Sequence, residues 1–130
     1  MSLNYYLDED SKIVDPNLFT QRANEVVESF IENGRARVSK HQARKFYNQV
    51  LLIQEKIDLA NDPEVAFKRQ LPFLRMLISK AYYARERKKV NQSFYKFIET
   101  NAGQISDLEE FRIFVHYFET VIAYCERLRG

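Results

Sequence analysis

The stretch that decides the fold is Val38-Ser39-Lys40-His41-Gln42-Ala43-Arg44-Lys45-Phe46-Tyr47-Asn48-Gln49-Val50, which continues to Ile57. Its apolar side chains recur at three- and four-residue steps, the spacing of one face of an α-helix. Ser39 stands just before this pattern, where its hydroxyl can accept from the free backbone N–H groups of a first turn. The stretch therefore predicts a capped helix from about Lys40 to Ala60. Its apolar face consists of Ala43, Phe46, Val50, Ile53 and Ile57.

The opposite face of the same helix is basic. No acidic residue occurs between Gly34 and Gln54. At about 100° per residue, the polar and basic positions lie away from the apolar stripe. One helix would therefore carry part of the core and a positive surface, which makes it the candidate functional element of the chain. The residues of this surface and of the segment before it are Arg35, Arg37, Lys40, His41, Arg44 and Asn48.

Length and composition indicate one soluble domain. The 130 residues are 45% hydrophobic and 29% charged, with a formal net charge of +2, which is typical of a globular protein and does not by itself indicate a nucleic-acid partner. Only 3 Gly and 3 Pro disfavour an all-β fold. We expect no membrane span and no secretory signal. One Cys cannot form an internal disulfide, so a reducing, cytoplasmic location is expected.

The N-terminal segment differs in character from the rest of the chain. Residues 1–15 are polar and acidic, and predict a flexible arm ahead of a single helical domain over residues 16–130. If the arm is held against that domain, the candidate anchors are apolar or aromatic side chains. These are Leu3, Tyr5 and Tyr6.

Breaking signals divide the first half of the domain. Asp15-Pro16 predicts the start of the first helix and Asn33-Gly34 its end. After Asn61-Asp62-Pro63, Pro72 either kinks one long helix or, the preferred interpretation, starts a new one. The second helix also has a second apolar side, which indicates packing between two neighbours in preference to a surface for another chain. That side consists of Leu51, Leu52 and Leu59.

The second half predicts two further helices. Asn91 caps a shorter helix, which ends near Asn101-Ala102-Gly103. Ser106 caps the last helix, with Glu109 at capping-box spacing. The last helix has the widest apolar face, centred on Phe118, and should be the most buried. The fold class predicted is all-α, a compact bundle of about five helices with a basic face.

A search for catalytic chemistry finds no constellation. His41 and His116 lack any paired metal-ligand spacing. Cys125 falls on an apolar stripe, as a buried structural cysteine would. The carboxylates near Asp107 stand at a helix start, where they stabilise the helix dipole. We therefore expect no enzymatic activity, no metal and no cofactor.

Two groups of basic residues carry the functional hypothesis. They would converge if the second and third helices pack antiparallel, and a joint patch would be a track for a phosphate backbone. Each group alone is as readily a solvated face. The candidate nucleic-acid-binding residues are Arg35, Arg37, Lys40, Arg44, Lys45, Lys80, Arg85, Arg87, Lys88 and Lys89. Tyrosines that could stack on bases, or equally pack in the core, are Tyr47, Tyr82 and Tyr83.

Three segments resemble a known family, the small subunit of type III-A CRISPR interference complexes (Csm complexes). Residues 39–50 are similar to its S-x-x-Q-[IL]-R-K-[FL]-Y-x-x-[VI] stretch, with Ala43 where a larger aliphatic residue is usual. Residues 74–87, which contain Lys80-Ala81-Tyr82-Tyr83-Ala84-Arg85, are similar to a second segment of that family. Residues 118–124 resemble F-E-A-[IV]-[VI]-A-Y, with Thr120 where Ala is usual.

The resemblance implies a small helical protein without catalytic activity. Family members stack in several copies as an inner filament along the guide RNA and its target RNA, and support a neighbouring backbone subunit that cuts the target. By position in the matching segments, the implied RNA contacts are Arg44, Lys45, Lys80, Arg85 and Arg87.

Two classes of function remain open from the sequence. The first is a sequence-independent RNA-binding subunit of a type III-A effector, with the equivalent subunit of a type III-B (Cmr) complex as a close variant. The second is a helical protein-interaction module whose basic face docks an acidic protein partner.

Overall fold

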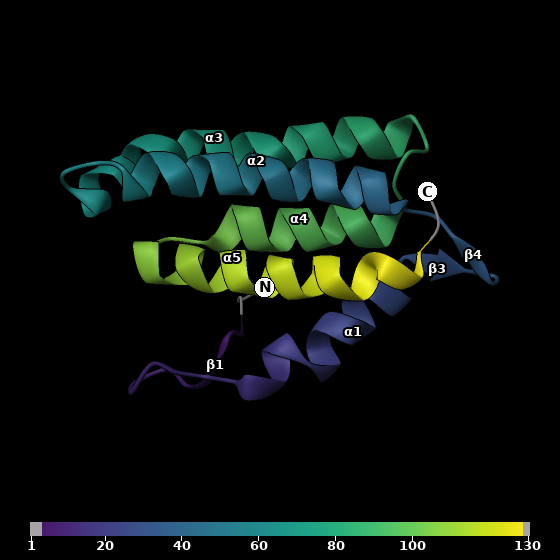
Figure 1. Cartoon of the computed structure of the whole chain (residues 1–130), viewed down its shortest axis with the longest axis horizontal. Coiled ribbons are helices and arrows are strands. Elements are labelled where there is room, and N and C mark those ends of the chain that lie inside the picture. Colours follow the sequence, from purple (N-terminus) through teal and green to yellow (C-terminus); the bar gives the residue numbers. More distant parts are fainter. Residues whose placement is uncertain (1–3, 129–130) are drawn as a thin grey trace.

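The computed structural model describes residues 4–128 as an all-α bundle with two short β-hairpins (Figure 1). Helices α2 and α3 lie side by side, α4 and α5 follow below them, and α1 packs on the far side of α5. The predicted fold class is confirmed. The elements are β1 (Tyr6–Asp8), β2 (Ile13–Val14), the 3₁₀ turn η1 (Pro16–Phe19), α1 (Gln21–Glu28), β3 (Ile31–Glu32), β4 (Arg35–Ala36), α2 (Lys40–Asp58), α3 (Pro63–Glu86), α4 (Gln92–Gln104), α5 (Leu108–Tyr124) and the 3₁₀ turn η2 (Cys125–Arg127).

Helix α2 forms as its sequence predicts. The Ser39 side chain accepts a hydrogen bond from the backbone N–H of Gln42 at 3.1 Å, which satisfies one of the free donors of the first turn. The whole predicted apolar stripe is buried. The second apolar side behaves differently: Leu51 packs against the core, whereas Leu52 and Leu59 are exposed. The interpretation of that side as packing between neighbours is thus correct only for Leu51.

Helix α3 is one continuous helix, so the preferred interpretation of Pro72 as a helix start was wrong. The helix begins instead at Pro63, where the Asp62 carboxylate caps Val65 N–H. Pro72 lies inside it, where a proline has no N–H to donate to the residue four positions earlier, Lys68. Both Pro72 and Lys68 are exposed, so water can hydrate the freed carbonyl and the helix continues.

The last two helices follow the prediction with small shifts. Asn91 caps α4 by accepting from Phe94 N–H. The α4 helix runs through Gly103 to Gln104, one residue beyond the expected stop near Asn101-Ala102-Gly103. The predicted Ser106 cap of α5 was wrong by one position: Asp107 is the cap and accepts from Glu110 N–H. The Glu110 carboxylate in turn accepts from the backbone N–H of Ser106, one residue before the N–H that a capping box would use.

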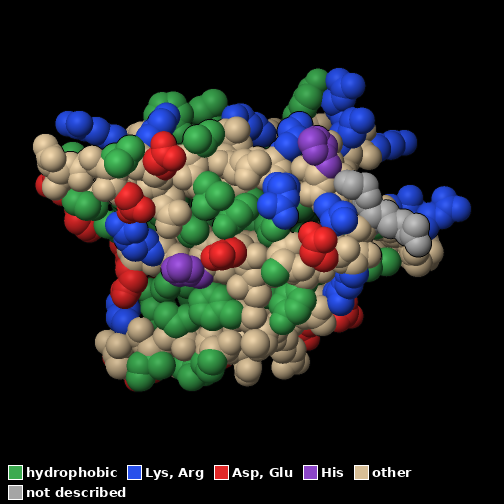
Figure 2. All heavy atoms as spheres, in the orientation of Figure 1, with side chains coloured by type: hydrophobic (Ala, Val, Ile, Leu, Met, Phe, Trp, Pro, Cys, Tyr) green, Lys and Arg blue, Asp and Glu red, His purple; other side chains and the backbone are tan. Residues whose placement is uncertain are grey.

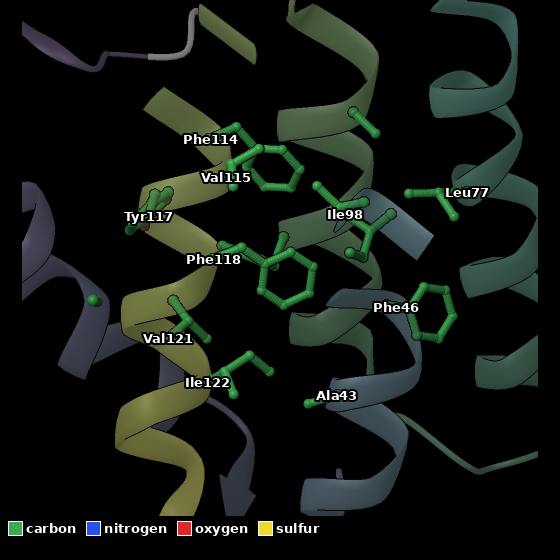
Figure 3. Packing of buried hydrophobic residues seen from close by; sticks show 14 of the residues in the cluster. Ala43, Phe46, Leu77, Ile98, Phe114, Val115, Tyr117, Phe118, Val121 and Ile122 are labelled. Carbon is green, nitrogen blue, oxygen red and sulfur yellow. The ribbon is translucent and has the colours of Figure 1, made fainter. Parts of the chain in front are cut away.

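The core is centred on α5, as predicted. Its aromatic rings interlock with those of its neighbours: Phe118 lies 5.3 Å from Phe97 of α4 and 5.4 Å from Tyr47 of α2, measured between ring centroids. Figure 3 shows α5 side chains pointing toward α2 and α4 in the middle of the bundle. The buried residues of α5 are Phe111, Ile113, Phe114, Val115, Tyr117, Phe118, Val121 and Ile122.

The N-terminal segment packs against the helical bundle from residue 4 onward. Strands β1 and β2 pair antiparallel, and Tyr5 and Tyr6 are buried. The Tyr5 hydroxyl donates to the Oδ1 atom of Asn101, a buried side chain of α4. The expectation that Tyr5 or Tyr6 anchors this segment agrees with the structure, while Leu3 lies outside the described residues.

The predicted end of the first helix at Asn33-Gly34 was also wrong. Helix α1 ends at Glu28, and Asn33-Gly34 forms the turn of the β3–β4 hairpin. Both residues have positive φ, 54° and 76°. Two-residue hairpin turns of type I′ require positive φ at both central residues, which is why they favour Asn-Gly.

Candidate nucleic-acid interface

A pocket opens between α2 and α3 at the end where α2 begins and α3 finishes. The two helices run antiparallel through a short connection, so the first turns of α2 lie beside the last turns of α3. The two predicted basic groups therefore do meet in part. The pocket has a volume of about 760 Å³ and is lined by Gln42, Lys45, Phe46, Asn48, Gln49, Ser79, Lys80, Tyr83, Ala84, Arg87 and Lys89.

The electrostatic character of the pocket is positive. Among its lining residues are four cations, Lys45, Lys80, Arg87 and Lys89, and no carboxylate. None of the four forms an ion pair with any residue in the range 4–128. Like charges brought together without a counter-charge repel, and an anionic ligand would relieve that repulsion. Figure 2 shows Lys and Arg side chains gathered at this end of the molecule. The pocket is thus an anion-binding candidate.

At the end of α3, Arg87 contacts Tyr83 and the chain turns back toward the pocket. The guanidinium of Arg87 lies 5.5 Å from the ring centroid of Tyr83, and its Nη1 donates to the Tyr83 hydroxyl at 2.9 Å. The chain then turns sharply, because Lys88 adopts a positive φ of 61°. Lys89 N–H bonds to Ala84 C=O and Lys88 N–H to Arg85 C=O, the two bonds of a Schellman motif. This turn brings Lys89 back to the pocket lining.

Three other predicted residues lie at the same end of the molecule but outside the pocket lining. Arg35 and Arg37 stand at and after β4, in the hairpin. Arg37 pairs with Glu32 across that hairpin at 3.9 Å. Lys40, at the start of α2, pairs with Glu126 at 3.8 Å. Exposed pairs of this kind contribute little stability, but they lower the net positive charge of this flank.

The remaining predicted residues are not brought together. Arg44 is exposed on the side of α2 that also carries Tyr47, near Cys125 of η2. Lys88 is exposed and forms the αL turn described above.

Arg85 belongs to a separate cluster on the α4 side of α3. Its guanidinium lies 4.8 Å from the Tyr82 ring centroid and 4.5 Å from that of Tyr95, and it donates to Gln92 Oε1 at 2.6 Å. With Glu86 also paired to it at 3.3 Å, Arg85 is already engaged within the protein. The predicted patch of ten cations is therefore divided, and four of them share one site.

Sequence reasoning missed several polar members of the pocket. Gln42, Gln49 and Ser79 line it beside the lysines, although none was singled out. The available signal was spacing: Gln42 and Gln49 stand three and four residues from Lys45, on the same helical face. Of the three candidate stacking tyrosines, only Tyr83 lines the pocket. Tyr47 packs edge-on against Phe118, and Tyr82 contacts Arg85.

The residues considered for catalysis occupy structural or solvated positions. His116 is exposed and lies 3.7 Å from Glu119. Cys125 is buried, and burial raises the pKa of its thiol to about 11, which keeps the thiol protonated and unreactive. Within residues 4–128, no group of three or more His, Cys, Asp or Glu side chains is placed to hold a metal ion. No helix in that range is long and apolar enough to cross a membrane.

Comparison with protein families identifies the chain. The model of the family described as Csm2 Type III-A matches residues 14–130, a range that contains the pocket and the five α-helices described between residues 4 and 128. The chain belongs to the Csm2 family. No significant match was found among curated proteins or among solved structures.

Membership in the Csm2 family confirms the resemblance inferred from the three sequence segments. It makes the chain the small subunit of the type III-A Csm complex, a structural subunit of a CRISPR effector that works with other subunits. The match is to the type III-A family, which decides between the type III-A and type III-B alternatives.

Proposed function

We propose that this Csm2 subunit binds RNA without catalysis, through the cationic pocket between α2 and α3, and so lines the path of the guide RNA and its target RNA in the effector. The observation that carries the proposal is the cluster of Lys45, Lys80, Arg87 and Lys89 with no carboxylate among the pocket's lining residues. Phosphate groups are the anions that every RNA presents irrespective of its sequence. Binding is therefore sequence-independent and is driven by release of counterions.

The other predicted cations have secondary roles in this proposal. Arg35, Arg37 and Lys40 flank the pocket at the same end of the molecule and extend its positive field. Arg44 and Lys88 are exposed and add to the field from neighbouring faces. Arg85 ties α3 to α4 through Tyr95 and Gln92.

Contact with other protein chains is also part of the proposal. Leu52, Phe73 and Met76 are each more than half exposed on α2 and α3. Large apolar side chains on a surface favour contact with another protein. We propose that further copies of the subunit, or the neighbouring backbone subunit, contact these side chains. A cytoplasmic location fits the single buried cysteine and completes the proposal.

The alternative function, a module whose basic face docks an acidic protein, would use the same cluster of pocket cations. An electrophoretic titration with single-stranded and duplex RNA at two salt concentrations separates the two. The RNA-binding function predicts weak binding that falls steeply as salt rises, whatever the RNA sequence. Absence of RNA binding at low salt, together with loss of complex assembly in Lys80→Glu, would favour the protein-docking module.

A further inference from the structure

The pocket between α2 and α3 is hollow, which a track for a phosphate backbone does not require. Its volume of about 760 Å³ lies within the range of roughly 300–1,000 Å³ that sites for small organic ligands occupy. Counterion release requires only cations within reach of the phosphates and no enclosed volume. The volume therefore leaves room for a ligand larger than a phosphate.

The lining combines three kinds of chemistry. The four cations attract a phosphate, and three side-chain amides, Gln42, Asn48 and Gln49, offer both donors and acceptors. Phe46 and Ala84 supply apolar wall. A nucleotide carries all three complementary features, since it has a phosphate, a base edge with donors and acceptors, and a flat apolar face.

Tyr83 is the lining residue placed to meet a base. It is 62% exposed, so its ring is available from solvent. Arg87 holds the side chain by donating to its hydroxyl and by lying over its ring. A ring held in this way loses little further rotational freedom when a base stacks on it, which lowers the entropy cost of binding.

We propose that this pocket seats one unpaired nucleotide of an RNA strand, with its phosphate among the four cations and its base stacked on Tyr83. The proposal rests on the RNA-binding function proposed above and names the form of RNA that the site takes. A base within a duplex is paired and stacked on its neighbours, so it cannot enter the pocket, whereas a base in a single strand can turn out at little cost. The site therefore distinguishes single-stranded from duplex RNA.

The test measures fluorescence anisotropy of three labelled probes at low salt. The probes are a single-stranded RNA hexamer, an abasic hexamer that keeps every phosphate, and a duplex of mixed sequence. Wild-type full-length chain should bind the hexamer at least about fivefold more tightly than the abasic strand, the lower end of what stacking one base contributes. Tyr83→Ala should remove that difference and leave affinity for the abasic strand and the duplex unchanged.

Two further variants control for nonspecific damage. Tyr83→Phe keeps the ring and loses only the hydroxyl, so it should retain most of the preference for the normal hexamer. Tyr124→Ala removes an exposed tyrosine that does not line the pocket, and should behave as wild type.

The outcomes distinguish the two proposals. If Lys80→Gln weakens binding to all three probes but Tyr83→Ala changes none of them, the RNA-binding function stands and the nucleotide pocket is overturned. An equal loss on all three probes in Tyr83→Ala also overturns it. If wild type binds no probe, both proposals fail.

Discussion

The anchoring of the N-terminal segment gives a sharp stability prediction, because two neighbouring tyrosines differ in one respect. The Tyr5 hydroxyl donates to Asn101 Oδ1, and Asn101 Nδ2 donates to the Phe97 carbonyl at 2.7 Å. The Tyr6 hydroxyl oxygen, although buried, has no hydrogen-bond partner in the described part of the chain. Replacing each tyrosine by phenylalanine removes one oxygen and keeps the ring in both cases.

The two substitutions should have different effects on the free energy of unfolding. Tyr5→Phe leaves the buried Asn101 oxygen without its donor, which costs about 1–3 kcal/mol. Tyr6→Phe removes an unsatisfied buried hydroxyl, so it should be neutral or stabilising. Urea unfolding followed by circular dichroism measures both. In a domain of this size, each kcal/mol lost should lower Tm by about 4 °C.

The double variant Tyr5→Phe with Asn101→Leu provides the control. This variant removes the donor and the acceptor together, so it should recover part of the stability that Tyr5→Phe alone loses. It also loses the hydrogen bond from Asn101 to the Phe97 carbonyl, which limits the recovery. Equal unfolding free energies for Tyr5→Phe and Tyr6→Phe would refute the reasoning, because they would mean that the Tyr5–Asn101 bond does not hold the segment to α4.

Three further predictions concern stability. Phe118→Ala should cost about 3–5 kcal/mol of unfolding free energy, since the ring is fully buried among aromatic neighbours; a cost below about 1 kcal/mol would place α5 at the periphery. Lys88→Gly should stabilise the chain by about 0.5–1 kcal/mol, because glycine adopts positive φ without strain; a lower Tm would contradict the αL turn. The pKa values of Cys125, Tyr5 and Tyr6 are all raised, mainly by burial. Above about pH 9 the unfolded chain therefore releases protons that the folded chain keeps. The free energy of unfolding should accordingly fall as pH rises from about 8 to about 10.5. A flat profile would argue against their burial.

The sequence predicts the helical framework well because its signals are local. The Ser39 cap and the stripe of α2 depend on residues within a few turns of one another, and hydrophobic spacing alone identifies the buried side of α5. The errors come where two local signals compete. Asn33-Gly34 serves equally as a helix end or a hairpin turn, and Pro72 as a helix start or an exposed interior proline.

The site is less predictable, since it depends on rotation of whole helices. The antiparallel packing that brings Lys45 beside Lys80 follows from two helices joined by a short connection. Nothing in the local pattern shows that Arg85 turns toward α4 while Arg87, two residues later, turns toward the pocket. Tyr5 and Asn101 stand 96 positions apart in the sequence, so the local spacing of apolar residues does not predict their hydrogen bond.

The measurement that tests the central claim most directly is the salt dependence of RNA affinity in two matched double variants. Lys45→Gln with Lys80→Gln neutralises two pocket cations, and Lys56→Gln with Lys68→Gln neutralises two exposed lysines toward the far ends of the same helices. Both remove the same charge. The account predicts that the pocket variant flattens the log–log slope for single-stranded RNA by about 1.4, at about 0.7 per lost phosphate contact, while the control keeps the wild-type slope. Equal slopes in the two variants would show that RNA responds to net charge alone and that the pocket is not its binding site.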